Sequence, residues 1–318
     1  MKKSLFLLLA LASALSLASA VRASLVYEKF TTDPALDGWQ SFGDSNLFQW
    51  DATNGVLDVT WDSTQPNSYY YHPLGVTLTT NDGFCVQFDL TVSNVMTFGY
   101  GQQLAVGLFN YAEATNNNYL RTWGTLPDVC EFDYFPADQN GDPASDDATT
   151  TDSATKFFFA YDNQTLNPGI TYRVVLVHWP DTLFITGTIF TNGQVMTTLP
   201  IVFANYPTMN DAGAFQLDTL SISSYADDES GDDVYAQGTV ANLACAWPLP
   251  VNTIQAIAAG KVQLASDTNW VYTLEQTADF QTWTPAAPAV TGNGTNLVLQ
   301  ATNTTPAYLF YQVQAHLP

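Results

Sequence analysis

The sequence predicts an all-β protein, a large antiparallel jelly-roll sandwich followed by a second, small β-sandwich domain. Short runs of alternating, β-branched and aromatic residues recur along the chain, and Asn-Gly, Asp-Gly and proline separate them. No stretch after the first 20 residues keeps a helical period. With 318 residues, of which 46% are hydrophobic and 14% aromatic, the chain can fill the cores of two domains.

The expected strands follow the turn signals along the chain. Asn54-Gly55 and Asn81-Asp82-Gly83 each precede such a run, and Asn192-Gly193 after Phe190 is a strong hairpin signal. Roughly eight to twelve strands over about 220 residues exceed an immunoglobulin module and fit a large double-sheet sandwich. The clearest runs of the larger domain are Val56–Trp61, Phe84–Val92, Leu104–Phe109, Lys156–Ala160, Tyr172–Trp179, Leu183–Phe190 and Phe215–Ile222.

A domain boundary is expected near Trp247-Pro248-Leu249-Pro250, because two prolines stiffen the chain and cannot donate to a sheet. The larger domain is assigned to residues 24–249, a linker to 250–261 and the small domain to 262–318. Strand-like runs in the small domain are Val271–Leu274, Asn296–Gln300 and Tyr308–Val313. A domain of about sixty residues has a marginal core, so we expect it to lean on its neighbour.

Residues 1–23 have the features of a secretory signal peptide. Lys2 and Lys3 precede an apolar run from Leu5 to Leu17, and small residues follow. The run is shorter than the ~20 residues that span a bilayer. No later segment is long and apolar enough to cross, so we expect a secreted or cell-surface protein without a membrane span after cleavage.

The chain is strongly acidic. Cleavage removes Lys2, Lys3 and Arg22 and leaves five basic residues against 30 acidic ones, a formal charge of −25. Nucleic acid is therefore not an expected partner, since binding phosphates needs clustered lysine and arginine. The cysteines are Cys85, Cys130 and Cys245, so at most one bridge forms within the chain, and buried thiols are equally compatible.

Glu131 and Asp133 stand two positions apart in the strand-like run Val129–Phe135, and Asp142 follows in Gly141-Asp142-Pro143. Side chains alternate along a strand, so Glu131 and Asp133 point the same way with Cα atoms about 7 Å apart. Three such carboxylates suit a hard cation or a pair that cleaves sugars. For Asp138 to Asp152 two interpretations stay open, a solvated surface loop and a source of calcium ligands.

The opening of the chain resembles the first strands of concanavalin A-like lectin/glucanase domains in secreted bacterial proteins, through Gly38-Trp39, Phe48-Gln49-Trp50 and Gly55–Val59. A closer resemblance is local: the segment from Glu131 to Pro143 resembles the metal-binding segment of legume lectins, and the two align without a gap. This resemblance implies metal ligands at Glu131, Asp133, Asp142 and the carbonyl of Phe135.

The segment departs from the lectin pattern at two ligands. The asparagine that binds calcium and sugar in legume lectins falls on Ala137, and the manganese-binding histidine falls near Asp147. The remaining set is all oxygen, which favours calcium over a transition metal. The sugar-binding aspartate of the family falls near Gln102 or Gln103, so any glycan needs other contacts.

Aromatic residues are the candidates for such contacts. Trp123, just before Gly124 and Pro127, is the preferred stacking platform for a sugar ring, together with Gln102 as a polar contact. Tyr69-Tyr70-Tyr71 and Trp61 are further candidates, although core packing is the more common fate of such residues.

The tail resembles an immunoglobulin-like or fibronectin-like module of secreted bacterial proteins, through Asn269–Leu274, Asp279–Trp283 and Leu309–Val313. No catalysis attaches to that resemblance.

The function expected from these observations is a non-catalytic, secreted protein that binds an extracellular polysaccharide or surface glycan, with calcium shaping its loops. One alternative is a glycoside hydrolase of the laminarinase type, with Glu131 as nucleophile and Asp133 as its supporting group. That family carries a third carboxylate at the next alternate position, where this chain has Phe135. The other alternative is a structural or adhesive surface protein without metal or sugar.

Overall fold

The structure is a computed structural model of the whole chain. It describes residues 24–98, 104–116, 127–136, 145–152, 156–180, 184–202, 215–226, 233–250, 254–278, 282–302 and 310–318. Within these residues no helix has the length and apolar character that a membrane span requires. In this part of the chain, helix is confined to α1 (Tyr111–Ala114) and to two short 3-10 turns, Pro34–Asp37 and Ser45–Leu47.

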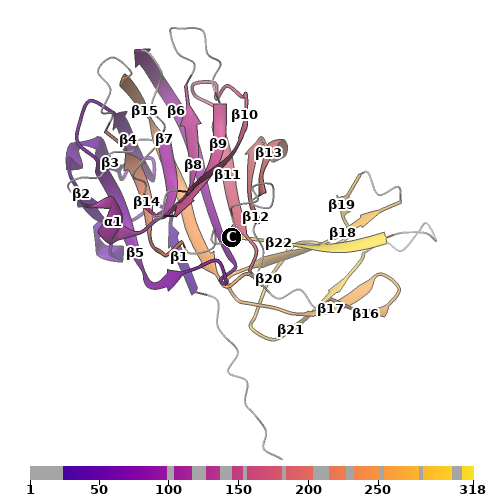
Figure 1. Cartoon of the computed structure of the whole chain (residues 1–318). Coiled ribbons are helices and arrows are strands. Elements are labelled where there is room, and N and C mark those ends of the chain that lie inside the picture. Colours follow the sequence, from indigo (N-terminus) through magenta and orange to yellow (C-terminus); the bar gives the residue numbers. More distant parts are fainter. Residues whose placement is uncertain are drawn as a thin grey trace, which may run out of the picture.

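Two large sheets lie face to face and form the main body (Figure 1). The first sheet has eight strands in the order β13-β12-β11-β6-β15-β4-β3, with β1 also paired to β15. Its strands are β1 (Ser24–Glu28), β3 (Phe48–Asp51), β4 (Val56–Asp62), β6 (Phe84–Phe98), β11 (Thr171–His178), β12 (Phe184–Thr191), β13 (Gln194–Val202) and β15 (Asp233–Trp247).

The second sheet has seven strands in the order β10-β9-β8-β7-β14-β5-β2. Its strands are β2 (Gln40–Phe42), β5 (Ser68–Leu78), β7 (Leu104–Phe109), β8 (Val129–Phe135), β9 (Ser145–Asp152), β10 (Lys156–Asp162) and β14 (Leu217–Ser224). All the pairings within both sheets are antiparallel. The all-β sandwich expected from the sequence is therefore confirmed.

A single hydrophobic core fills the space between the two sheets. Alternate residues of β6, from Phe84 to Val92, point into it from the first sheet, and Cys130, Phe132 and Tyr134 of β8 point into it from the second. Because side chains alternate, the residues between them lie on the outer faces of the sheets. The outer face of the second sheet carries the candidate site.

The hairpin predicted at Asn192-Gly193 is confirmed, since β12 ends at Thr191 and pairs with β13 from Gln194. Asn192 has φ 50° and Gly193 φ 73°, the left-handed values that a two-residue hairpin turn needs. The described residues form fifteen strands up to Trp247, more than the eight to twelve expected. Edge strands such as β2, three residues long, are too short to show alternation in the sequence.

The surface-loop interpretation of Asp138–Asp152 is wrong for its second half. Residues Ser145–Asp152 form strand β9, which pairs with β8 on one side and β10 on the other. Hydrogen bonds to two neighbouring strands outweigh the low strand propensity of aspartate and serine, and the threonine run 149–151 favours a strand. Asp138 to Asn140 lie outside the described residues.

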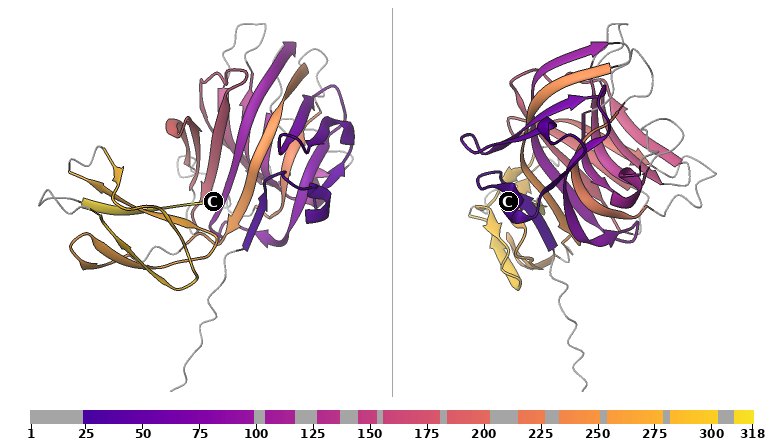
Figure 2. Two further views of the ribbon diagram at one scale, coloured as in Figure 1. Left: turned by 180° about the vertical axis from the view of Figure 1, so that it is seen from behind. Right: turned by 90° about the vertical axis from the view of Figure 1, so that its left-hand side faces the viewer.

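Strands after residue 254 form two small sheets beside the sandwich (Figure 2). The three-stranded sheet has β16 (Gln255–Ala258), β17 (Lys261–Ala265) and β21 (Asn296–Gln300), and the other has β18 (Val271–Thr277), β19 (Thr284–Pro285), β20 (Val290–Thr291) and β22 (Phe310–His316). Strand β16 lies within the segment that the sequence assigns to a linker.

The small sheets share one apolar cluster with the outer face of the first large sheet. Leu274, Leu299 and Leu317 pack there with Cys85 on β6 and Ala246 on β15. The chain end lies at this junction in every view (Figures 1 and 2). The first large sheet is thus covered on both faces, by the core on one side and partly by the C-terminal strands on the other.

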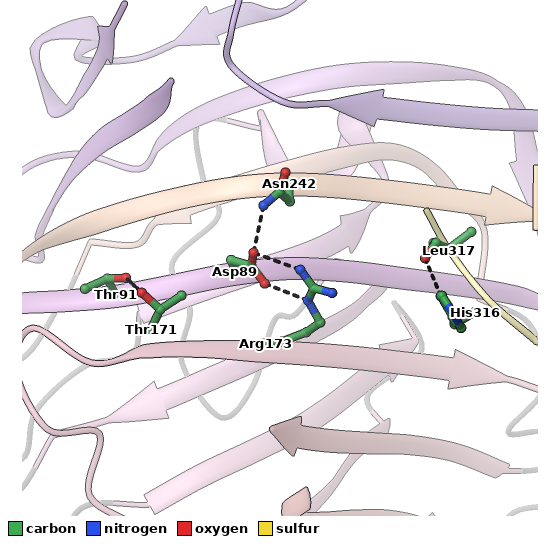
Figure 3. Close-up of polar contacts among 7 residues, drawn as sticks. All are labelled: Asp89, Thr91, Thr171, Arg173, Asn242, His316 and Leu317. Carbon is green, nitrogen blue, oxygen red and sulfur yellow. Dashed lines mark hydrogen bonds and ion pairs between the residues drawn. The ribbon is translucent and has the colours of Figure 1, made fainter. Parts of the chain in front are cut away.

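Farther along the same outer face, polar residues tie three neighbouring strands together (Figure 3). Arg173 on β11 donates from Nε to Oδ1 of Asp89 at 2.8 Å and from Nη2 to Oδ2 at 3.0 Å. Asn242 on β15 donates from Nδ2 to the same Oδ2 at 2.7 Å. The hydroxyls of Thr91 and Thr171 lie 2.8 Å apart. Asp89 therefore links β6 to both of its neighbours.

The three cysteines are buried free thiols, so no disulfide forms in the structure. Burial raises the pKa of the Cys85 thiol to about 12. Each cysteine lies in a strand, β6, β8 or β15, as their strand-like surroundings in the sequence indicate.

Candidate functional site

Glu131 and Asp133 lie on the outer face of β8, opposite in direction to the core residues Cys130 and Phe132. Their relative exposures are 1% and 0%. Strand alternation places both carboxylates on one side of the sheet, and the surrounding chain encloses them. Few proteins bury acidic side chains fully unless these groups have partners or bind a metal.

The strand register places Glu131 in a row of paired residues that crosses the second sheet and ends at β2 on one side. Glu131 pairs with Gly107 on β7, Gly107 with Ser221 on β14, Ser221 with Tyr71 on β5, and Tyr71 with Gln40 on β2. Three strand spacings separate Glu131 from Tyr71, roughly 14 Å. The row therefore connects Glu131, through the small residues Gly107 and Ser221, to the aromatic ring of Tyr71 and the amide of Gln40.

Gly107 lets β7 lie against the backbone that carries Glu131. A Cβ atom at Gly107 would lie 2.4 Å from the carbonyl oxygen of Cys130 and 2.4 Å from Cα of Glu131. Those are backbone atoms, so no side-chain rotation would relieve the contact. Glycine at this position is a requirement of the local packing beneath the acidic pair.

A buried tyrosine fixes the Glu131 carboxylate. The hydroxyl of Tyr225 donates to Oε2 of Glu131 at 2.9 Å. Tyr225 packs edge-on against Tyr69, with ring centroids 5.9 Å apart, and Tyr69 donates its hydroxyl to the carbonyl oxygen of Ala114 at 3.0 Å. The orientation of Glu131 is thus set by an aromatic cluster on β5, α1 and the segment after β14.

Asp133 lies next to Ala105 on β7 and opposite residue 147 on β9 in the strand register. Burial raises the pKa of the neighbouring Cys130 thiol, and the negative charge of Asp133 raises it further. The lectin-like segment thus has its second acidic position within the sheet. Asp147, near which the histidine of the lectin pattern is expected to fall, is the register partner of Asp133 on β9.

The oxygen donors in this segment fit calcium by their chemistry. In a calcium site Glu131 and Asp133 would supply two carboxylates from one face, and Phe135, the last residue of β8, would supply a backbone carbonyl. Asp142 belongs to the segment that joins β8 to β9 and lies outside the described residues. Within the residues that the structure describes, no three histidine, cysteine or acidic side chains are grouped closely enough to hold a metal ion.

The predicted sugar contacts Gln102 and Trp123 also lie outside the described residues. Of the two roles considered for Trp61 and Tyr70, core packing holds and sugar stacking does not, because both rings are buried in the core between the sheets. Tyr69 is fully buried in the aromatic cluster.

Tyr71 is also mostly buried, with 7% relative exposure, but it lines a groove, together with Tyr111 and Asp218. The sequence carried no signal for Tyr111 or Asp218, because the strand register brings them together from distant segments.

No protein-family model matches the sequence, and no curated protein matches it in sequence. The structure is similar to the acidic lectin of winged bean solved with methyl-α-D-galactose, with a TM-score of 0.48 and 9% identity over 71% of this chain and 99% of the lectin. It is similar to lectin II from Ulex europaeus, with a TM-score of 0.47 and 14% identity over 71% and 98%.

A legume lectin-like domain from Entamoeba histolytica is also similar, with a TM-score of 0.41 and 11% identity over 68% and 94%. The identities and TM-scores are low, and the function proposed below rests on the residues of this chain.

Proposed function

We propose that this protein binds glycans on the outer face of its second sheet, next to a calcium ion held by Glu131, Asp133, Asp142 and the backbone carbonyl of Phe135. The observation that carries the proposal is the pair of enclosed carboxylates, Glu131 and Asp133, on one face of β8. The segment from Glu131 to Pro143 also resembles the metal-binding segment of legume lectins.

A divalent cation suits this pair electrostatically. Two acidic side chains on alternate positions of one strand repel each other when both are ionised, and burial strengthens the repulsion. Calcium accepts six to eight oxygen ligands from carboxylates and backbone carbonyls, often on flexible loops. A cation shared by both carboxylates offsets the repulsion and the cost of burying them.

Bound calcium would supply positive charge and open coordination sites for hydroxyl oxygens. The residues of the chain supply the positioning. Tyr225 holds one oxygen of Glu131 through its 2.9 Å hydrogen bond, which leaves the carboxylate a restricted set of orientations. Gly107 keeps β7 close beneath it.

The geometry favours binding over hydrolysis. In a retaining glycosidase the nucleophile must reach the anomeric carbon, with a second carboxyl about 5 to 5.5 Å away as proton donor. Glu131 is only 1% exposed and its Oε2 is engaged by Tyr225. The next alternate position holds Phe135, which carries no acid.

The proposed setting is extracellular, since residues 1–23 have the pattern of a cleaved signal peptide. The proposed partners are polysaccharides or surface glycans. Calcium is abundant outside cells, and extracellular modules commonly bind it with modest affinity.

A glycan array probed with calcium and again with a chelator tests the proposal. We expect a subset of glycans whose signal disappears with the chelator and in Asp133→Asn. Asp58→Asn, an equivalent change at an exposed position of β4, should leave that subset unchanged. If no signal depends on calcium or on Asp133, the proposal is wrong. Release of reducing ends from β-glucans would instead support the hydrolase.

A further inference from the structure

A groove of about 570 Å³ opens on the outer face of the second sheet, at the β2 end of the row that contains Glu131. Its walls include Gln40 on β2, Tyr71 and Val76 on β5, Tyr111 on α1 and Asp218 on β14. We name it the tyrosine groove. Its volume falls within the range of about 300–1,000 Å³ typical of small-ligand sites. All of its lining residues belong to the described part of the chain.

An irregularity in β5 forms one wall of the groove. Pro73 pairs with Thr219, and the next paired positions are Leu78 and Leu217. Four residues of β5, 74–77, therefore face the single residue Asp218 of β14. Gly75 in this segment has φ 73°. Such bulges bend a strand away from its partner and are common next to functional sites.

The groove contains a short hydrogen-bonded chain. The Tyr71 hydroxyl lies 3.2 Å from Oε1 of Gln40 and 3.1 Å from the hydroxyl of Tyr111. Tyr71 has one hydroxyl hydrogen, so donating it to Gln40 makes its oxygen the acceptor for Tyr111. Burial, with the neighbouring Tyr111 hydroxyl, raises the pKa of Tyr71 to about 12, so the Tyr71 hydroxyl keeps its proton at neutral pH.

Asp218 and Gln40 each keep a hydrogen-bonding atom that a ligand in the groove can use. Oδ1 of Asp218 accepts the backbone N–H of Tyr111 at 2.9 Å and the Thr219 hydroxyl at 2.8 Å. Among the described residues no donor reaches Oδ2 of Asp218, and no acceptor reaches Nε2 of Gln40. The groove thus offers a ligand one charged acceptor, Oδ2 of Asp218, and one donor with two hydrogens, Nε2 of Gln40. These groups line the groove together with the rings of Tyr71 and Tyr111, whose centroids are 4.8 Å apart.

This chemistry fits a neutral saccharide. A sugar presents apolar C–H faces that pack on aromatic rings, and hydroxyls that both donate and accept. Asp218 accepts a sugar hydroxyl but repels an anionic ligand, and no lysine or arginine lines the groove. The Gln40 amide hydrogens disfavour a simple cation. Val76, which is 43% exposed, adds an apolar edge.

We propose that the tyrosine groove is a second, cation-independent binding site for a neutral sugar unit of an oligosaccharide. It goes beyond the calcium-dependent site because its contacts come from Gln40, Tyr71, Tyr111 and Asp218. Roughly 14 Å of sheet separates it from Glu131. Binding here does not require the acidic pair, and the two sites stand or fall separately.

The test is isothermal titration calorimetry in the presence of EDTA, with cellohexaose, laminarihexaose and xylohexaose as neutral probes and hexagalacturonate as the acidic probe. EDTA removes the calcium-dependent site from the measurement. We expect at least one neutral probe to bind and the acidic probe not to. Silence from all three neutral probes, or equal binding of hexagalacturonate, would overturn the proposal.

Variants separate ligand contact from folding. Asp218→Asn keeps the Oδ1 acceptor that holds the Tyr111 N–H and changes only the ligand-facing atom, so we expect about tenfold weaker binding. Tyr111→Ala removes the ring and should weaken binding at least as much. Tyr235→Ala, on β15 of the other sheet, is the matched control and should bind as the parent does. Undiminished binding by a folded Asp218→Asn variant would contradict the assigned contact.

Discussion

Gly107 is the residue whose replacement bears most directly on the acidic pair. Because a Cβ there would lie 2.4 Å from two backbone atoms of β8, Gly107→Ala must push β7 and β8 apart. We expect the free energy of unfolding to fall by about 1–3 kcal/mol, the usual cost of overpacking. Urea unfolding measures it. An unchanged midpoint and slope would show that the two strands do not need this close approach.

Ionisation of Glu28 lowers the stability of the folded protein as the pH rises towards neutral. Its side chain is buried on β1 and accepts the Phe30 N–H at 2.5 Å. Burial raises the pKa of Glu28 above its ordinary 4.5, and the charge of Asp37 adds to the rise. A carboxyl with a raised folded-state pKa costs no stability below its unfolded pKa. The cost appears as the pH rises through the raised value.

Glu28→Gln tests this sign. The amide keeps an oxygen acceptor for Phe30 but does not ionise, so the variant escapes the cost that grows with pH. We expect the difference in melting temperature, variant minus parent, to be larger at pH 7 than at pH 4. A difference that is the same at both pH values would show that Glu28 does not titrate in this window.

At the residue scale, the sequence predicted part of the site. Alternation alone placed Glu131 and Asp133 on one face, since the period of a strand is fixed by backbone geometry. It gave no sign that Tyr225, 94 positions later, would donate to Glu131, because that contact depends on how β14 lies in the sheet. Trp61 and Tyr70 show the converse, as aromatic rings in strands pack inward as readily as outward.

Strand β15 shows how one element combines a bulge with a side-chain anchor. Its register with β6 shifts between Ala241 and Ala244, and Asn242 between them has φ 48°. Asparagine tolerates this left-handed conformation better than most residues. Its side chain also donates to Asp89, so the bulge is tied to β6 (Figure 3).

Two substitutions at Asn242 separate these contributions. Asn242→Gly loses the hydrogen bond to Asp89 but adopts positive φ freely, so we expect a loss of about 1 kcal/mol. Asn242→Ala loses the same bond and adds strain of about another 1 kcal/mol. Chemical unfolding of both variants measures the difference. Equal stability of the two would contradict a cost for the left-handed backbone.

At the element scale, prediction succeeded where a strand has a hydrophobic pattern or a defined turn. The β12–β13 hairpin was readable because Asn192-Gly193 supplies two positive φ values. Strand β9 was not, since its sequence SDDATTTD lacks apolar residues and its stability comes from pairing on both sides. The bulge of β5 at 74–77, which forms the groove wall, could not be predicted either, because a register shift is recognisable only when the pairing of both strands is known.

At the scale of the whole molecule, the outer faces of the two large sheets differ in character. The first sheet contributes Cys85, Ala244 and Ala246 to a cluster with the C-terminal strands. The second sheet carries Glu131, Asp133 and the tyrosine groove on its outer face. The sequence predicted that a small domain would need its neighbour. It did not predict which face, since small residues such as alanine give no directional signal.

We propose that Glu131, Asp133 and Asp142 share one calcium ion, so calcium should raise the melting temperature of the full chain. Melting in EDTA is compared with melting in rising calcium, for the parent and for Asp133→Asn. At 100-fold excess over the dissociation constant, calcium adds about 2.7 kcal/mol, which raises the melting temperature by about 5–10 °C. We expect this rise in the parent and its loss in Asp133→Asn. A parent that melts at the same temperature in EDTA and in excess calcium would contradict it.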